Sequence, residues 1–398
     1  MSRFVKFAGP LVAVFALAAC NAGGGSSSVP GTTGGQSSPQ MRSGVPDWQA
    51  RHLATRACAD VRGTGRAQCE VLVQNAGPMS PDVAGWGPAD LQARYKLPSS
   101  TKGGGVKVAI VDAYDNPNVA KDLAAYRTNF GLGTAKFFKY NQTGQQSNYP
   151  SGSTGWGVEI DLDVQMVSAV CPKCTIDLIE ANSSNTSDLE AAEAEAVTLG
   201  AHIVSNSWIC YGSVNCDDPT KFNTPGVMYL AASGDNGYND NGAPEALASV
   251  VSVGGTVLSK SGSKYNESAW NGAGSGCATG ITKPAWQHDK SCTSRTDADV
   301  SALAWQAAEY DTYGNGGWFT VGGTSVASPI IAGVYGLAGN AANQHAGKKL
   351  WNLKNRSLKL NDITTGSNGS CGGSYLCTAG PGYDGPTGWG TPLGIQAF

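Results

Sequence analysis

The length of the chain and its low charge exclude several classes of protein. It has 398 residues, of which 41% are hydrophobic and 14% are charged. That is enough apolar content for one large core or two smaller ones, and too little charge for a disordered chain. The net charge of -3 at pH 7 gives no reason to expect nucleic acid as a partner.

Residues 1–44 predict export and attachment to a membrane. Arg3 and Lys6 precede an apolar run at 7–19, which is typical of a signal peptide and too short to span a bilayer comfortably. The run ends in Leu-Ala-Ala-Cys, which resembles a bacterial lipobox and implies a lipid on Cys20. The alternative is an ordinary signal peptide that is cut nearby. We expect a lipoprotein signal at 1–20 and a flexible Gly/Ser-rich tether at 21–44, with the protein at the bacterial cell envelope, facing periplasm or exterior.

The cysteines support an oxidising compartment. The chain has 11 cysteines, and setting Cys20 aside leaves an even number. Neighbours in sequence predict five local disulfides: Cys58/Cys69, Cys171/Cys174, Cys210/Cys216, Cys277/Cys292 and Cys371/Cys377. Cys171 and Cys174 could instead form a redox or zinc motif, but the sequence offers no second CxxC or nearby His to complete a zinc site.

The order of the expected elements predicts an α/β fold. We expect a short helical segment at 45–84 and one more helical turn at 90–95. Buried strands then alternate with helices, which favours a mostly parallel sheet flanked by helices. Strands are expected at 106–112, 175–180, 202–208, 227–232 and 250–255, and helices at 122–130 and 189–199. In such sheets the functional site lies beyond the carboxyl ends of the strands, where Asp112, Trp208 and Asp235 fall.

A candidate nucleophile follows these strands. Gly-Gly-Thr-Ser at 322–325 precedes an apolar run that can start a helix. Ser325 would lie at the helix N-terminus, where free N–H groups favour the oxyanion of acyl transfer. The alternative is that Thr324 or Ser325 only caps the helix.

A pair of acids could serve as its base. Glu159 and Asp163 are spaced by four, so in a helix their Cβ atoms would lie about 5–6 Å apart. The alternating apolar residues around them favour a strand by periodicity alone, in which the two acids would lie about 13 Å apart. Only a helix makes a working pair. The four histidines lie in no catalytic context, so a carboxylate must activate the serine, and Glu159 is the best candidate.

The motifs together resemble one family. From about residue 85 to 398 the chain resembles the sedolisins, serine-carboxyl peptidases with a subtilisin-like fold. The matching runs are Val-Ala-Ile-Val-Asp at 108–112, Glu-Ile-Asp-Leu-Asp at 159–163, Ala-Ser-Gly-Asp-Asn-Gly at 232–237 and Gly-Thr-Ser at 323–325. The resemblance implies that Ser325 is the nucleophile, Glu159 the base, Asp163 its orienting partner and Asp235 the oxyanion donor. Asp112 and Trp208 would support this network.

A last motif implies calcium. Asp-Ile at 362–363 with Gly-Pro-Gly-Tyr-Asp at 380–384 resembles the family's calcium site. The implied ligands are carboxylates and backbone carbonyls, which calcium prefers: Asp362, Ile363, Gly380, Gly382 and Asp384.

Two departures from the family pattern concern self-activation, which the first puts in doubt, and the substrate cleft. The stretch between Cys20 and residue 85 is too short for the family's long propeptide, so a full pro-domain is missing or replaced. Ile209 stands where the family usually has Gly after Ser-Trp, which would narrow the cleft.

The sequence therefore predicts a monomeric serine-carboxyl endopeptidase, at 85–398, that cuts polypeptides at acidic pH through an acyl-enzyme. The alternatives are another serine hydrolase, acting on esters, and a catalytically impaired, membrane-tethered binding protein that keeps the fold.

Overall fold

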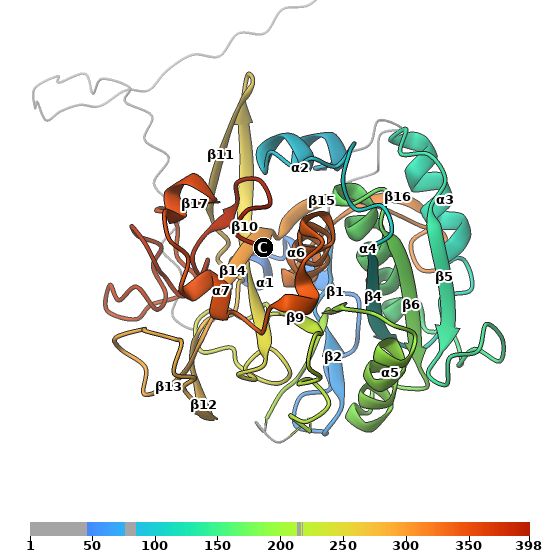
Figure 1. The fold of residues 1–398 in the computed structure, drawn as a ribbon, viewed down its shortest axis with the longest axis horizontal. Helices are drawn as coiled ribbons and strands as arrows, with labels where there is room; N and C mark the ends of the chain where they lie inside the picture. The colour runs from blue at the N-terminus through green and yellow to red at the C-terminus, as the bar shows by residue number, and fades with distance from the viewer. Residues whose placement is uncertain (1–45, 76–84, 213–215, 217) are drawn as a thin grey trace, which may run out of the picture. The chain divides into compact units, whose positions relative to one another are not determined.

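The computed structural model describes residues 46–75, 85–212, 216 and 218–398 (Figure 1). The expected signal at 1–20, the tether at 21–44 and the lipid on Cys20 lie outside these residues. None of the helices in the described part of the chain is long and apolar enough to cross a membrane.

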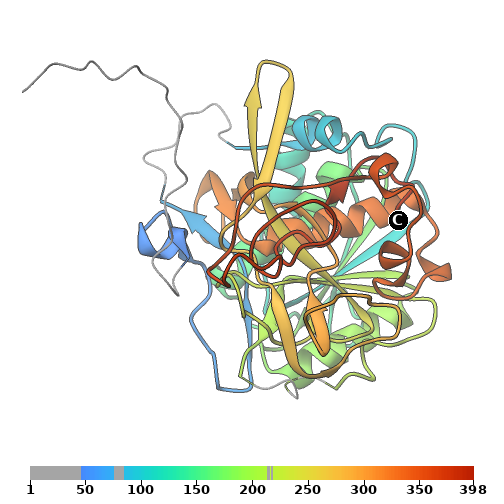
Figure 2. The same cartoon turned by 90° about the vertical axis from the view of Figure 1, so that its left-hand side faces the viewer.

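An eight-stranded sheet forms the centre of the structure, in the order β11-β10-β9-β7-β4-β6-β5, with β14 also paired to β10. Its strands pair in parallel except for the hairpin of β10 and β11, which projects from the sheet (yellow, top of Figure 2). The predicted α/β fold with a mostly parallel sheet is confirmed. The strands are β4 (Lys107–Ala113), β5 (Lys136–Asn141), β6 (Thr175–Ala181), β7 (Ile203–Asn206), β9 (Met228–Ala232), β10 (Val250–Ser261), β11 (Lys264–Ala269) and β14 (Val300–Leu303).

Two long helices that pack on each other carry the candidate base and nucleophile. Every residue of α4 (Thr154–Val170) from Trp156 onward is buried, and so is every residue of α6 (Thr324–Ala338) up to Leu337. Because α4 is buried on all sides, its sequence has no polar face and its helical period is hidden. The other helices are α2 (Pro88–Arg94), α3 (Val119–Asn129), α5 (Thr186–Thr198) and the short α7 (Lys348–Trp351).

The expectation of a helical segment at 45–84 is wrong. Its described part holds one short helix, α1 (Asp47–Ala50), and three strands, β1 (Ala54–Arg56), β2 (Ala67–Cys69) and β3 (Leu72–Gln74). The strands form because distant segments supply their hydrogen-bond partners: β3 pairs with β16 (Gly317–Gly322), and β2 with β8 (Trp208–Cys210). These tertiary pairings override the local helical pattern.

The remaining elements lie around this frame. β1, β3 and β16 form a four-stranded sheet with β15 (Trp305–Asp311). The five predicted disulfides are all present. The last short strands are β12 (Gly276–Thr282), β13 (Ser294–Asp297), β17 (Leu360–Asn361) and β18 (Thr391–Pro392), and the 3-10 turns are Ala341–Asn343 and Arg356–Leu358.

Candidate active site

Ser325 lies in the first turn of α6, directly behind a sharp bend at Gly323. Gly323 has φ +115°, a conformation that residues with a side chain rarely adopt. The Ser325 hydroxyl lies 3.3 Å from the carbonyl oxygen of Ser207, to which it can donate, and its side chain is fully buried. The N-terminus of a helix favours negative charge, so the start of α6 favours it at this position.

Three buried carboxyl groups lie together near this serine. Glu159 and Asp163 lie one turn apart on α4, as the helical alternative requires, and Asp112 lies near the carboxyl end of β4. Asp163 Oδ1 accepts a hydrogen bond of 2.8 Å from the hydroxyl of Ser207. Among the described residues, no hydrogen bond of ordinary geometry reaches either oxygen of Glu159 or of Asp112.

Burial is the largest cause that raises the pKa of each of these acids. Burial raises the pKa of Glu159 well above its usual range, and the nearby charges of Asp163 and Asp112 raise it further. The Ser325 hydroxyl lies close enough to Glu159 to oppose this rise by favouring the ionised form. Burial raises the pKa of Asp163 as well, followed by the charge of Asp112, and burial raises the pKa of Asp112 to about 8. The group therefore shares protons, and its titration belongs to the group as a whole.

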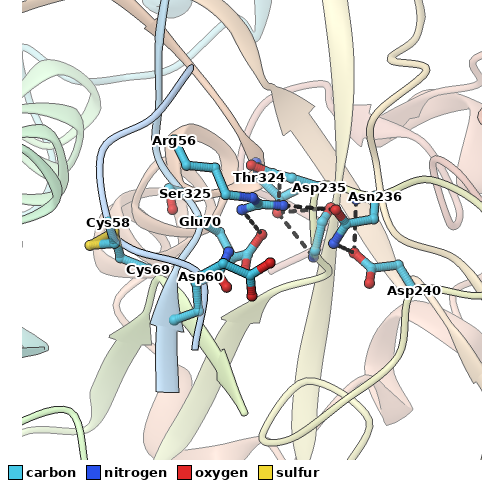
Figure 3. Close-up of polar contacts among 12 residues, drawn as sticks. Arg56, Cys58, Asp60, Cys69, Glu70, Asp235, Asn236, Asp240, Thr324 and Ser325 are labelled. Carbon is cyan, nitrogen blue, oxygen red and sulfur yellow. Dashed lines mark hydrogen bonds and ion pairs between the residues drawn. A yellow bond between two sulfur atoms is a disulfide. The ribbon is translucent and has the colours of Figure 1, made fainter. Parts of the chain in front are cut away.

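Asp235 lies in the loop after β9 and contacts Thr324, the residue that precedes Ser325 (Figure 3). Its Oδ1 accepts hydrogen bonds from the backbone N–H of Thr324 at 2.8 Å and from the Thr324 hydroxyl at 3.0 Å. Its Oδ2 has no partner among the described residues and faces Gly323. Burial raises the pKa of Asp235 well above its usual range, and the charge of Glu70 adds to the rise, whereas Arg56 opposes it. A protonated Asp235 can donate a hydrogen bond to a developing oxyanion.

Trp208 was expected to support the carboxyl network, but its indole N–H does not bond to any of these carboxyl groups. Its indole Nε1 donates to the backbone carbonyl of Val111 at 3.0 Å. The ring is fully buried and packs edge-on against Phe222. Trp208 therefore fixes β8 against β4 next to Asp112, without touching a carboxylate through its N–H.

Four residues at the site were missed by sequence reasoning. Ser207 contacts both Asp163 and Ser325, and its only signal was its place in front of Trp208 in the Ser-Trp motif. Trp48, Arg56 and Glu70 come from the N-terminal segment. Trp48 donates to the Asp235 carbonyl at 2.8 Å, and Arg56 forms an ion pair with Glu70 at 3.2 Å (Figure 3). No local pattern in the sequence indicates these long-range contacts.

The residues expected to bind calcium form one loop cluster apart from this site. Asp362 accepts a hydrogen bond from Gly382 N–H at 2.9 Å, and Asp384 accepts one from Gly380 N–H at 3.1 Å. Burial, with the charge of Asp362 among the smaller causes, raises the pKa of Asp384 to about 7. Among the described residues, nothing donates a hydrogen bond to the carbonyl oxygens of Ile363, Gly380 or Gly382. Two facing carboxylates beside free carbonyls fit the ligand preferences of calcium.

A second acidic cluster was not expected. One oxygen each of Asp122, Asp161 and Asp311 lies within 4.8 Å of the others, and all three residues are buried. Burial raises the pKa of Asp161 well above its usual range, and the charges of Asp122 and Asp311 raise it further.

Comparisons with known proteins agree with the expected resemblance. No family model matches the chain. Kumamolisin from Bacillus sp. (strain MN-32) is 26% identical over 388 residues, covering 84% of this chain and 66% of the relative. Sedolisin from Pseudomonas sp. (strain 101) is 26% identical over 353 residues, covering 77% of this chain and 60% of the relative. The chain thus spans slightly less than two thirds of the length of these relatives.

A solved structure gives the same result. The structure of Pseudomonas sedolisin, a serine-carboxyl proteinase complexed with two molecules of pseudo-iodotyrostatin, aligns with a TM-score of 0.66 at 25% identity. The alignment covers 78% of this chain and 96% of that structure. The chain thus has a subtilisin-like α/β fold and is similar to sedolisin and kumamolisin in sequence and, for sedolisin, in structure.

Proposed function

We propose that the chain is a serine-carboxyl endopeptidase that hydrolyses polypeptides through an acyl-enzyme on Ser325. The observation that carries this proposal is the place of Ser325 between two buried acids with different surroundings. Glu159 lies within a group of carboxyls on one side, and Asp235 turns a free oxygen toward the helix N-terminus on the other. Acids in such different surroundings can divide the roles of base and hydrogen-bond donor.

In the first step Glu159, ionised while Asp163 or Asp112 holds the shared proton, takes the proton of Ser325, whose oxygen attacks the carbonyl carbon of the substrate. Asp163, held by the Ser207 hydroxyl, stabilises and orients Glu159, and Asp112 belongs to the same proton-sharing group. The protonated Glu159 then donates its proton to the leaving amine. Water attacks the ester by the reverse route and frees Ser325.

The oxyanion forms at the N-terminus of α6. The neutral Asp235 donates from Oδ2 and the backbone N–H of Ser325 donates from the other side. Donors of this kind contribute about 10²–10³ in rate when they are fixed in advance. Because Asp235 donates only while it is protonated, we infer that activity peaks on the acid side.

Three further parts of the proposal concern the setting of the enzyme. Calcium would be held by Asp362 and Asp384 with the carbonyls of Ile363, Gly380 and Gly382, and would brace the C-terminal loops. A lipid on Cys20 would tether the protein, acting as a monomer, at the cell envelope. Loss of membrane fractionation in a Cys20→Ala variant tests the tether.

Digestion of a peptide library at several pH values tests the activity. The wild-type chain, preincubated at acid pH, is compared with Ser325→Ala and Glu159→Gln. Both variants should lose at least about 10²-fold in rate, because each removes a group that takes part in the transition state. Ser328→Ala is the matched control: Ser328 lies on the same buried helix but bonds Ser205 at 3.0 Å, away from the site, and its loss should leave cleavage nearly unchanged. Cleavage that rises from pH 5 to pH 8 and survives in both site variants would contradict the proposal.

A further inference from the structure

Four buried acids meet where α3, α4 and β15 pack together. Asp122 comes from α3, Asp161 from α4 and Asp311 from the end of β15, and one oxygen of each lies within 4.8 Å of the others. Glu309 lies two residues before Asp311 on β15, so both side chains point to the same face of the strand. We call these four residues, which are all fully buried, the four-acid cluster.

Backbone donors hold two of these acids in place. The turn after β15 folds around Asp311, and the N–H groups of Gly314 and Asn315 donate to its Oδ2 at 2.9 Å and 3.0 Å. The N–H of Thr312 donates to Oδ2 of Asp122 at 2.9 Å. Hydrogen bonds from N–H groups favour the ionised form of a carboxyl group. The geometry of these two acids is therefore fixed and suits a negative charge.

The other two acids have free oxygens. Oδ2 of Asp161 accepts a hydrogen bond of 2.6 Å from the side chain of Asn116, but its Oδ1 has no partner among the described residues. Neither oxygen of Glu309 has a partner among them. Burial raises the pKa of Glu309 well above its usual range, and the charges of Asp161 and Asp311 raise it further. Buried carboxyl oxygens without donors are unusual, and they are the kind of atom that binds a cation.

Positive side chains do not balance the cluster. None of the ion pairs among the described residues includes any of its four acids. Other buried acids of this chain do have such partners: Asp177 lies 2.8 Å from Lys107, and Asp299 lies 2.6 Å from Arg295. Because buried charges are paired or coordinate metals, the cluster requires either protons or a metal ion.

We propose that the four-acid cluster is a binding site for one divalent cation with the size and chemistry of Mn²⁺, separate from the calcium loop of Asp362 and Asp384. Carboxylate oxygens suit Mg²⁺, Ca²⁺ and Mn²⁺. Calcium takes roughly six to eight oxygens, and magnesium usually keeps several of its waters. A closed cluster of four carboxyl groups suits neither as well as Mn²⁺, which gives up its waters more readily than magnesium.

The cation would join three elements of the fold. It would link α4, which carries Glu159 and Asp163, to α3 and to β15 through one ligand set. Asp161 lies between the two catalytic acids in the sequence and points away from them, toward the cluster. Binding of this cation does not depend on the proposed peptidase activity, so it can be measured without a substrate.

The test follows Mn²⁺ binding to the metal-free full chain at pH 7 by electron paramagnetic resonance, in which bound Mn²⁺ loses the sharp signal of the free ion. It uses the Asp384→Asn chain, so that the calcium loop does not take up the probe. We expect one Mn²⁺ per chain. Adding Asp161→Asn or Glu309→Gln should weaken binding at least about tenfold, since even the outer partners of a metal site contribute that much. The matched control is Asp177→Asn, which changes a buried acid that Lys107 already pairs and should bind Mn²⁺ as its parent does.

A second measurement does not require the cluster variants to fold. In the same parent chain, Mn²⁺ should broaden the nuclear magnetic resonance signals of the Gly314 and Asn315 amides, which donate to Asp311, before that of Gly380 in the calcium loop. A folded parent chain that leaves the free-ion signal unchanged overturns the inference and shows that the four acids hold protons instead. Binding that persists unchanged in both cluster variants, or broadening that begins at Gly380, also overturns it.

Discussion

Thr324 determines which oxygen of Asp235 can carry a proton. Its N–H and its hydroxyl both contact Asp235 Oδ1, at 2.8 Å and 3.0 Å, so the proton of a neutral Asp235 belongs on Oδ2. An asparagine in the same place would keep its oxygen toward Thr324 and its NH2 toward the oxyanion position, and an amide donates at any pH.

Asp235→Asn should therefore change the pH dependence of cleavage. Under the proposed mechanism, wild-type activity should fall as pH rises through the raised pKa of Asp235, because the ionised side chain would repel the oxyanion. The variant should retain more of its acid maximum at neutral pH than wild type does, measured as kcat/KM across pH. Asp240 is the control, because it is also a buried acid with a raised pKa but does not contact Gly323. The activity of Asp240→Asn should decline with rising pH as wild-type activity does. Identical profiles for wild type and Asp235→Asn would remove Asp235 from the oxyanion site.

Asp112 should make folding more stable at acid pH. Burial raises the pKa of Asp112 from an ordinary 3.8 to about 8 in the folded chain, so folding takes up a proton. The stability from this group is fully present below pH 4 and is lost as pH rises toward 8, at up to about 1.4 kcal/mol per pH unit. Urea unfolding at pH 4, 6 and 8 should show this fall, and Asp112→Asn should reduce its slope.

The control for this prediction is Asp60, whose pKa is shifted in the opposite direction to that of Asp112. Asp60 has its pKa lowered to about 2 by Arg62, so its stability contribution is lost only as pH falls through that range. Asp60→Asn should leave the slope between pH 4 and pH 8 unchanged. An equal slope in wild type and Asp112→Asn would show that Asp112 does not gain a proton on folding.

Gly103 should tolerate alanine less well than Gly105. Both have positive φ, +87° and +83°, so alanine costs about 1 kcal/mol of backbone strain at either position. A Cβ at Gly103 would also lie 2.3 Å from the sulfur of Cys171, whereas a Cβ at Gly105 would meet nothing within 4 Å. We expect Gly103→Ala to lower the free energy of unfolding by about 1–3 kcal/mol more than Gly105→Ala. Equal melting temperatures for the two variants would contradict this packing at the Cys171–Cys174 disulfide.

Calcium should raise the melting temperature through the loop of Asp362 and Asp384. A ligand that binds only the folded state stabilises it by about 2.7 kcal/mol at 100 times its dissociation constant. A chelator should remove the gain in wild type, and Asp384→Asn should abolish it. Asp161→Asn, which changes the other acidic cluster, is the control and should keep the gain in melting temperature. If the gain in melting temperature survives in Asp384→Asn and disappears in Asp161→Asn, the calcium ion binds at the Asp122, Asp161 and Asp311 cluster, and our proposed site is wrong.

Most of the buried core could be predicted from the sequence, whereas the N-terminal segment at 45–84 was predicted wrongly. The strands that became β4, β6 and β9 are short apolar runs that are buried on both faces, so local composition was enough to find them. α4 was ambiguous because both its faces are buried, and only the need for a Glu159–Asp163 pair favoured a helix. The structure brings these acids, Asp112 and Asp235 to one place around Ser325, as the motif order implied.

The N-terminal segment could not be predicted in the same way. β2 and β3 are strands because β8 and β16, which lie far along the chain, complete their hydrogen bonds. A three-residue strand carries too little local signal to show which edge it will join. For the same reason the contacts of Glu70 with Ser207 and Arg56 depend on the folded topology alone.

The complete burial of α4 and α6 has a consequence for local unfolding. Backbone amides exchange with solvent through openings whose free energies range from near zero at frayed segments to the full free energy of unfolding in the core. These two helices pack on each other with hardly a residue at the surface, so their amides should exchange only when the whole unit unfolds. Glu159 and Ser325 would then keep their mutual register for the lifetime of each folded molecule, whatever the surface loops do.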